Sequence, residues 1–232
     1  MPLTRAFLTL DQSVGWSAQS QTPMAPKRLS GKLPKASPSR IAILGWGSLL
    51  KRPDELSIRG EWHNDGPRLP IEFARISKGG HLTLVIAPRR RLIRTYWALS
   101  GHNTLTDAID NLANREGTSD LENIGYVNAD GGQRARFPTY IPQLRAWMKR
   151  RSLHAVIWTD LEANFQEKRE KKLTTKAAVD YLRARAPSVR AKAADYVQIA
   201  PPQSRTQLRP HLEKELGIKP RQTPRRRAKQ TR

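Results

Sequence analysis

Apolar residues along the first two thirds of the chain follow patterns that are typical of strands. Ile41–Leu44 is a continuous apolar run that predicts a buried strand leading directly into Gly45. Leu69–Ser77 and His81–Ala87 alternate between apolar and polar residues, and Lys78-Gly79-Gly80 between them predicts a hairpin. Further strands are predicted at Thr95–Leu99, Ile124–Val127 and Leu153–Thr159.

Elsewhere apolar residues recur every three to four positions, which is the period of an amphipathic helix. Helices are predicted over residues 104–116, 140–150, 163–185, 189–199 and 203–216. Strands dominate the early part of the chain and helices its last third. This order predicts an α+β fold, in which a mixed or antiparallel sheet curls toward a small barrel and the C-terminal third is helical.

Charge is distributed unevenly along the 232 residues. Lys and Arg number 42 and Asp and Glu number 20, which gives a formal net charge of +22. Residues 1–39 hold five basic residues and one acid, and residues 218–232 hold seven basic residues and no acid. Because neither segment has a sustained apolar period, we predict a disordered basic leader (1–39) and a disordered basic tail (218–232) around one domain at 40–217. That domain keeps 30 basic and 19 acidic residues.

The basic excess favours a polyanion such as nucleic acid as a partner. A groove for single-stranded nucleic acid interleaves aromatic with basic residues. The basic runs Arg89–Arg91, Lys149–Arg151 and Lys168–Lys172 contain no aromatic residue. Nonspecific binding of nucleic acid is therefore predicted for the two terminal segments rather than for a dedicated groove.

Several classes of site are excluded by residue type. The chain has no cysteine, so it has no disulfide, thiol nucleophile or thiolate metal site. The five histidines show no pairing at i, i+2 or i, i+4, so neither a metal nor another cofactor is predicted. The longest uncharged apolar stretch, Ile41–Leu50, is too short to span a bilayer. We predict a cytoplasmic protein without a membrane partner.

Gly45-Trp46-Gly47-Ser48-Leu49 directly follows the first predicted strand. Two glycines at i and i+2 allow backbone angles closed to other residues, so that several N–H groups converge on a carboxylate or phosphate. A dinucleotide fingerprint would need a third glycine where Leu50 stands, and a nucleophile elbow would need glycines two residues before and after Ser48. A tight turn packed by Trp46 explains the segment equally well.

One helix has a carboxylate on its apolar stripe. After Asn103, the predicted N-cap, one face carries Leu105, Ala108, Ile109 and Leu112. The next position on this stripe is Glu116, and Gly117 is predicted to end the helix. Burial and the negative end of the helix dipole both disfavour the charged form of Glu116, which raises its pKa toward the range of a general base. Alternatively the helix end frays, and Glu116 turns to water or pairs with Arg115.

The glycine turn and this glutamate together resemble the γ-glutamylcyclotransferase superfamily, and most of all its glutathione-degrading branch, whose loop reads Gly-Tyr-Gly-Ser-Leu. The matching residues are Gly45-Trp46-Gly47-Ser48-Leu49, Leu112-Ala113-Asn114-Arg115-Glu116 and Gly125-Tyr126. The similarity runs from about Arg40 to Thr159. In this chain Trp46 replaces the usual tyrosine and removes its hydroxyl, and the stretch Gly117–Asn123 lengthens the spacing before Gly125-Tyr126.

The resemblance implies a small mixed β-barrel surrounded by helices, with a pocket at its mouth. The amides of Gly45, Trp46, Gly47, Ser48 and Leu49 would hold the γ-glutamyl end of a small substrate, and Tyr126 would line the pocket. Glu116 would take a proton from the substrate's α-amino group. That amine then attacks its own γ-carbonyl, which closes 5-oxoproline and releases an amine or peptide. Because the nucleophile belongs to the substrate, this chemistry needs no cysteine, Ser–His pair, metal or other cofactor.

Other interpretations of these features are kept open. One is an inactive barrel that binds a polyanion or nucleic acid through its basic surface and terminal segments. Another is a module that binds a carbohydrate or nucleotide phosphate with the glycine loop. Asp160 and Glu162 face the pocket or belong to the first turn of a helix, and Arg75 and Arg136 are candidates for binding a substrate carboxylate.

Overall fold

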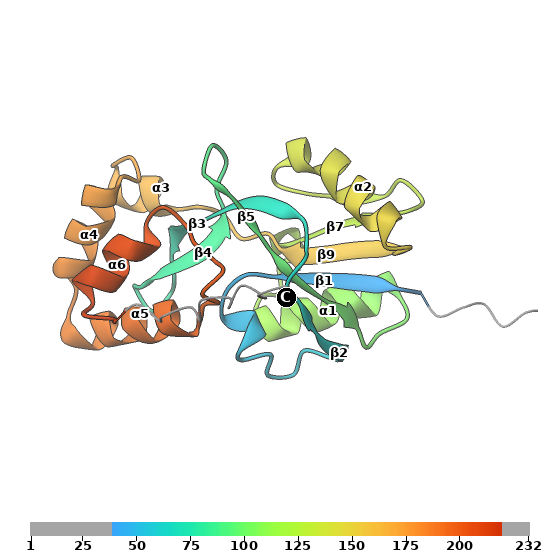
Figure 1. Cartoon of the computed structure of the whole chain (residues 1–232), viewed down its shortest axis with the longest axis horizontal. Helices are drawn as coiled ribbons and strands as arrows, with labels where there is room; N and C mark the ends of the chain where they lie inside the picture. The colour runs from blue at the N-terminus through green and yellow to red at the C-terminus, as the bar shows by residue number, and fades with distance from the viewer. Residues whose placement is uncertain (1–38, 220–232) are drawn as a thin grey trace, which may run out of the picture. The chain divides into compact units, whose positions relative to one another are not determined.

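The computed structural model describes residues 39–219. Apart from Ser39, Ile218 and Lys219, the predicted leader (1–39) and tail (218–232) lie outside the described residues. In the described part of the chain nine strands form two sheets, one ordered β2-β6-β1-β9-β7-β8 and one ordered β4-β3-β5 (Figure 1). The strands are β1 (Ile41–Gly45), β2 (Ile58–His63), β3 (Arg68–Ile76), β4 (Leu82–Ile86), β5 (Leu92–Arg94), β6 (Tyr96–Ser100), β7 (Ile124–Asn128), β8 (Gln133–Arg134) and β9 (Ala155–Thr159).

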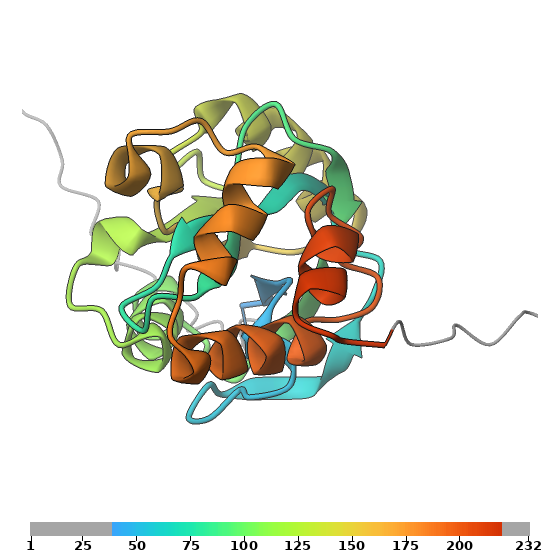
Figure 2. The same ribbon diagram turned by 90° about the vertical axis from the view of Figure 1, so that its left-hand side faces the viewer.

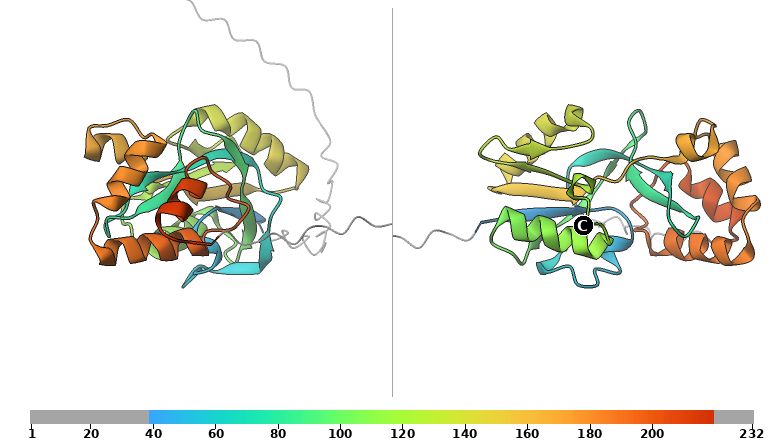
Figure 3. Two further views of the ribbon diagram at one scale, coloured as in Figure 1. Left: turned by 60° about the vertical axis from the view of Figure 1, so that its left-hand side comes forward. Right: turned by 180° about the vertical axis from the view of Figure 1, so that it is seen from behind.

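Helices cover the sheets from several sides. Within residues 39–219 the α-helices are α1 (Leu105–Glu116), α2 (Ile141–Arg150), α3 (Phe165–Arg169), α4 (Thr175–Arg183), α5 (Pro187–Ile199) and α6 (Arg209–Glu215). Seen from behind, α1 and α2 lie on opposite faces of the larger sheet (Figure 3). Figure 2 shows α4, α5 and α6 packed together near the β3–β4 hairpin. No helix of the described residues is long and apolar enough to cross a membrane.

The central strand β1 is buried on both faces. Ile41 and Ile43 pack against the apolar stripe of α1, whereas Ala42 and Leu44 belong to the core shared by β3, β4, α2 and the C-terminal helices. β1 pairs with β9 in parallel and with β6 antiparallel. A strand that is covered on both sides needs apolar residues at every position, which explains the continuous run rather than an alternation. β1 is thereby held rigidly, and its end delivers the glycine loop at a fixed place.

The predicted mixed α+β class is confirmed, and the strands predicted for β1, β3, β4, β6, β7 and β9 are present, including the β3–β4 hairpin. In the described residues the strands do not close into a barrel but form two sheets. Both sheets contribute to one apolar core, which contains Leu44 of β1 and Phe73 of β3. The sheets therefore pack together without sharing backbone hydrogen bonds around a closed ring.

Several predicted boundaries were wrong for local reasons. The helix predicted at 163–185 is two helices, because Glu170 adopts a left-handed conformation with φ of 52° and ends α3. A new helix then begins after Thr174, whose side chain accepts a hydrogen bond from the Ala177 N–H. The helix predicted at 203–216 is only α6, and Thr104 rather than Asn103 caps α1.

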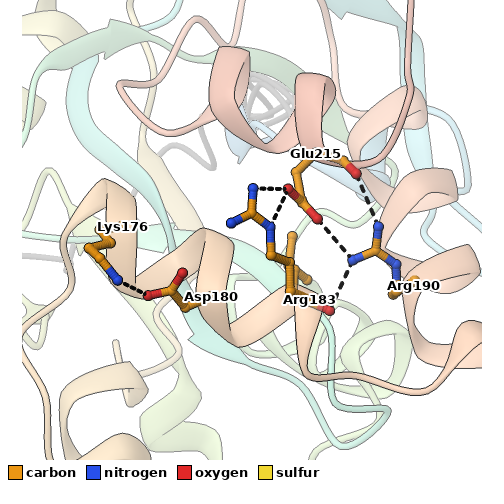
Figure 4. A network of polar contacts seen from close by, with 6 residues as sticks. Lys176, Asp180, Arg183, Arg190 and Glu215 are labelled. Carbon is orange, nitrogen blue, oxygen red and sulfur yellow. Dashed lines mark hydrogen bonds and ion pairs between the residues drawn. The ribbon is translucent and has the colours of Figure 1, made fainter.

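The C-terminal helices are joined by a carboxylate (Figure 4). Glu215 of α6 forms ion pairs with Arg183 of α4, at 2.9 Å, and with Arg190 of α5, at 3.2 Å. Arg190 also donates to the Leu182 carbonyl near the end of α4. Hydrogen bonds from Arg183, the largest cause, and from Arg190 lower the pKa of Glu215, so its carboxylate is ionised at neutral pH. One acid thus fixes the relative positions of three helices.

The segment between α5 and α6 is attached to β3 and to the glycine loop. Glu72 of β3 is fully buried and accepts hydrogen bonds from the backbone N–H groups of Gln207, at 3.0 Å, and Leu208, at 3.3 Å. The Ser204 hydroxyl donates to the Trp46 carbonyl at 2.9 Å. Because a buried carboxylate without partners is costly, these hydrogen bonds favour a single position for the segment.

Candidate functional site

A cavity of about 330 Å³ lies between the end of β1 and the C-terminal end of α1. It is lined by Gly45, Trp46, Gly47, Ser48 and Leu49 of the glycine loop and also by Glu116. Its volume is at the lower end of the usual range for sites that bind small molecules. The two features that the sequence singled out therefore lie in one cavity, although α1 follows the loop only after five intervening strands.

The glycine loop presents unpaired backbone donors to this cavity. Ser48–Leu50 form a single 3-10 turn, in which the Leu50 N–H bonds to the Gly47 carbonyl. Within the described residues the N–H groups of Gly47, Ser48 and Leu49 have no acceptor. The Trp46 indole is buried and donates to the Leu84 carbonyl at 3.2 Å, which anchors the loop to β4. Consecutive free N–H groups on an anchored loop are suited to hold a carboxylate or an oxyanion.

The close approach of α5 to the glycine loop leaves no room for a side chain at Gly47. Neither loop glycine has a positive φ, but Gly47 adopts φ of −129° and ψ of −133°, which lie outside the main regions occupied by residues with a side chain. A Cβ atom at position 47 would also lie 2.7 Å from the hydroxyl oxygen of Tyr196. The loop and a residue of α5 approach each other so closely that only glycine fits between them.

Glu116 is the last residue of α1, and its side chain is 15% exposed. Gly117 follows in the left-handed conformation, with φ of 63°, and ends the helix as predicted. Oε1 of Glu116 accepts from Nη1 of Arg115 at 2.8 Å, and Thr159 forms a further hydrogen bond with this side chain. The predicted inward orientation and the alternative pairing with Arg115 thus occur together.

Burial raises the pKa of Glu116, and the Arg115 charge and the hydrogen bonds from Arg115 and Thr159 only partly oppose this effect. A carboxylate with a raised pKa accepts a proton more readily than an ordinary surface carboxylate does. Glu116 is therefore suited to act as a general base on a molecule held in the cavity.

Tyr196 lines the cavity from α5 and was not predicted. Its hydroxyl oxygen accepts a hydrogen bond from the Leu84 N–H at 3.2 Å. Burial raises the pKa of Tyr196 to about 12, so the hydroxyl keeps its proton at neutral pH. Its own proton is donated to no described residue, which leaves it available to a ligand. The sequence predicted only that α5 is a helix and did not indicate that one of its residues reaches the cavity. This helix also lies outside the stretch that carries the family resemblance.

Two cations also line the cavity. Arg75 of β3 was a candidate for binding a carboxylate, and Lys78 follows β3 in the hairpin turn. Nη1 of Arg75 donates to the Glu162 carbonyl at 3.0 Å. Burial lowers the pKa of Arg75, but a guanidinium stays charged at any physiological pH. The cavity thus contains positive charge, neutral donors and one carboxylate that can accept a proton.

Comparison of the chain with protein-family models, with curated proteins and with solved structures finds no match. The cavity geometry is therefore the basis for the functional assignment.

Tyr126, which was expected to line the pocket, lies outside this cavity. In the β7–β9 pairing, Thr159 at the cavity stands opposite Ile124, and Tyr126 is two residues further along the strand, or about 6.6 Å away. Its ring packs beside the α1 core, with the Arg134 guanidinium 5.4 Å from its centroid. The tyrosine therefore does not line the cavity that holds Glu116.

Asp160, Glu162 and Arg136 also lie outside the lining of the cavity. Oδ2 of Asp160 accepts from the Arg136 N–H at 2.6 Å, and Nε of Arg136 donates to the Asp160 carbonyl at 3.1 Å. The expectation that the two acids begin a helix was wrong as well, because α3 begins only at Phe165. In residues 39–219 no group of three or more His, Asp or Glu side chains is placed to hold a metal ion.

Proposed function

We propose that this protein is a γ-glutamylcyclotransferase-like enzyme that converts a γ-glutamyl amide or peptide into 5-oxoproline and a free amine. The observation that supports this function is the cavity shared by Glu116 and the free amides of Gly47, Ser48 and Leu49. General base and oxyanion donors are the two elements that an intramolecular aminolysis needs from a protein. The reacting amine and carbonyl belong to one molecule, so the enzyme mainly has to fold the substrate.

In the proposed reaction the α-amine of the substrate attacks its γ-carbonyl carbon. Glu116 takes one proton from the amine as the new C–N bond forms, and the loop amides hold the oxygen as it becomes negative. The tetrahedral intermediate then collapses, the original amide C–N bond breaks, and Glu116 returns the proton to the leaving nitrogen. No proton or electron is gained or lost overall, and the raised pKa of Glu116 favours its transient protonation.

Tyr196 supplies a further donor in this proposal. Trp46 stands where the resemblance would place a tyrosine hydroxyl, and its indole N–H is used by the Leu84 carbonyl. The Tyr196 hydroxyl lies against Gly47 and has its proton free, so it can donate to the substrate oxygen beside the loop amides. Arg75 and Lys78 would attract the carboxylates of a γ-glutamyl substrate.

The barrel type of fold and the cytoplasmic location belong to the same proposal. The common apolar core of the two sheets is compatible with a barrel that is not fully closed.

The proposal is tested by incubating the purified full chain with γ-glutamyl peptides, including glutathione, and measuring 5-oxoproline by mass spectrometry. Glu116→Gln is expected to lower the rate by about 10² to 10⁴-fold, because the general base is lost. Asp110→Asn is the matched control, since Asp110 is an exposed acid on the same helix. Turnover of the Glu116→Gln variant at the wild-type rate, with an unchanged circular dichroism spectrum, would falsify this mechanism.

A further inference from the structure

A second hollow, of about 450 Å³, is surrounded by arginines. We call it the arginine hollow and define it by Arg68, Arg94, Arg150 and Arg151. Asp65 is the only acid among its lining residues. None of its lining residues also lines the cavity that holds Glu116. The hollow is therefore a separate site, and the inference drawn from it goes beyond the proposed enzymatic function.

Two of these arginines face each other across a sheet. Arg68 of β3 and Arg94 of β5 are direct partners in the antiparallel register. Side chains of direct partners lie on the same face with their Cβ atoms about 5 Å apart, and like charges in this arrangement destabilise a sheet. Both residues are exposed. An anion between the two guanidinium groups would relieve this repulsion.

Asp65 neutralises Arg151 and is not available to the other arginines. Its Oδ2 accepts from Nη2 of Arg151 at 2.7 Å, and its Oδ1 accepts from the Trp97 indole at 2.8 Å. The Arg151 guanidinium also lies 5.1 Å from the Trp97 ring centroid and 5.4 Å from that of Trp147. Arg151 is thus held by an ion pair and by contacts with two aromatic rings where it lines the hollow.

The remaining three arginines have no acidic partner in the described residues. Arg68, Arg94 and Arg150 take part in none of the ion pairs formed by residues 39–219. Nineteen of the 20 acids of the chain lie in the described residues, so the rest of the chain offers only Asp11. An anionic partner for these three guanidinium groups would therefore come largely from outside the chain.

We propose that the arginine hollow binds the phosphate backbone of a nucleic acid, without reading its sequence. Guanidinium groups match phosphate oxygens with paired hydrogen bonds, and several exposed arginines around one hollow suit neighbouring phosphates. Base recognition is not available here, because the Trp97 and Trp147 rings are buried and already contact Arg151. Stacking on bases requires exposed rings.

The test measures binding of a fluorescent single-stranded oligonucleotide of mixed sequence to the full chain by anisotropy, over a series of salt concentrations. Each contact with a phosphate contributes about 0.7 to the slope of log K against log salt concentration for single strands. The variant R68Q/R94Q/R150Q is expected to lower the slope by about 2 and the affinity at 0.1 M salt by roughly 100-fold. All three side chains are exposed, so the fold is expected to stay intact, which urea unfolding checks.

The matched control removes the same charge elsewhere. Lys168, Lys192 and Lys214 are exposed residues of α3, α5 and α6. K168Q/K192Q/K214Q is expected to change the slope by less than about 0.7, which corresponds to one phosphate contact. Equal effects of the two triple variants would overturn the proposal, because binding would then depend on total charge. A wild-type chain that binds no oligonucleotide at low salt would also overturn it. Loss of inorganic-phosphate binding in R68Q/R94Q/R150Q, with oligonucleotide binding unchanged, would identify a site for small anions instead.

Discussion

The close approach of Tyr196 to the glycine loop gives a quantitative prediction for Gly47→Ala. The new Cβ atom would lie 2.7 Å from the Tyr196 hydroxyl oxygen but 3.5 Å from the ring carbon that carries it. The ring cannot move away freely, because its hydroxyl accepts from the Leu84 N–H. Overpacking of this kind costs about 1–3 kcal/mol, so we expect Gly47→Ala to lower the free energy of unfolding by about 2 kcal/mol.

Removing the hydroxyl should relieve this clash. Tyr196→Phe alone is expected to cost about 1 kcal/mol, because the Leu84 N–H loses its acceptor. In the double variant the Cβ atom lies 3.5 Å from the ring carbon and 3.9 Å from the Leu84 Cβ atom, which are ordinary van der Waals distances. The double variant should therefore be about as stable as Tyr196→Phe. Its free energy of unfolding should then be about 2 kcal/mol higher than the sum of the two single effects predicts.

The cycle is measured by urea unfolding of the four proteins, followed by tryptophan fluorescence, with the slopes m compared to check that only stability changes. Gly131→Ala combined with Tyr196→Phe is the control. Gly131 has φ of 96°, so Gly131→Ala is itself costly, but a Cβ atom there meets nothing within 4 Å and the two effects should add. Additivity of Gly47→Ala and Tyr196→Phe within about 0.5 kcal/mol would refute the reasoning. The hydroxyl would then not lie against the loop.

Three further results are expected. Arg209→Met should lower the free energy of unfolding by about 3 kcal/mol or more in urea unfolding, because the carbonyls of Val197, Ala200 and Pro201 lose a buried donor; an effect below about 1 kcal/mol would contradict this. For the proposed enzyme, kcat/KM should rise as pH rises through the raised pKa of Glu116. Arg115→Gln should move that rise to higher pH, because the Arg115 charge lowers the pKa of Glu116. A pH profile that does not shift in this variant would exclude Glu116 as the general base. Because burial raises the pKa of Glu116 in the folded protein above its value in the unfolded chain, protonated Glu116 stabilises the fold. This contribution is complete below the pKa of the unfolded chain and is lost as pH rises through the pKa of the folded protein. In urea unfolding at several pH values, Glu116→Gln should therefore gain stability relative to the wild type over that pH range.

Features that depend on neighbouring residues in the chain could be predicted from the sequence. Each of these features shows within a few residues which side chains are buried. Examples are the continuous apolar run of β1, the alternation of apolar and polar residues in β3 and β4, and the apolar stripe of α1. Gly117 ends α1 because a left-handed residue is needed there, which is again a local requirement. The same local stripe placed Glu116 on the inward face of its helix.

Features that depend on distant partners could not be predicted. β2 is mostly exposed, and β8 has only two residues, so neither leaves an apolar pattern. Tyr196 resembles any other residue of an amphipathic helix until the fold brings it to Gly47. Tyr126 was misplaced because a motif fixes residue order but not the register of β7 against β9.

The hydrogen bond from Ser204 to the Trp46 carbonyl joins residues that are 158 positions apart. Proteins are synthesised from the N-terminus at about 5–20 residues per second, so the loop leaves the ribosome roughly 10–30 s before the segment that holds it. During that interval the Trp46 carbonyl lacks the Ser204 hydroxyl that later donates to it. A nascent or truncated chain that ends before α5 therefore carries the glycine loop and Glu116 but lacks Tyr196, and its cavity is open on the side that α5 later covers.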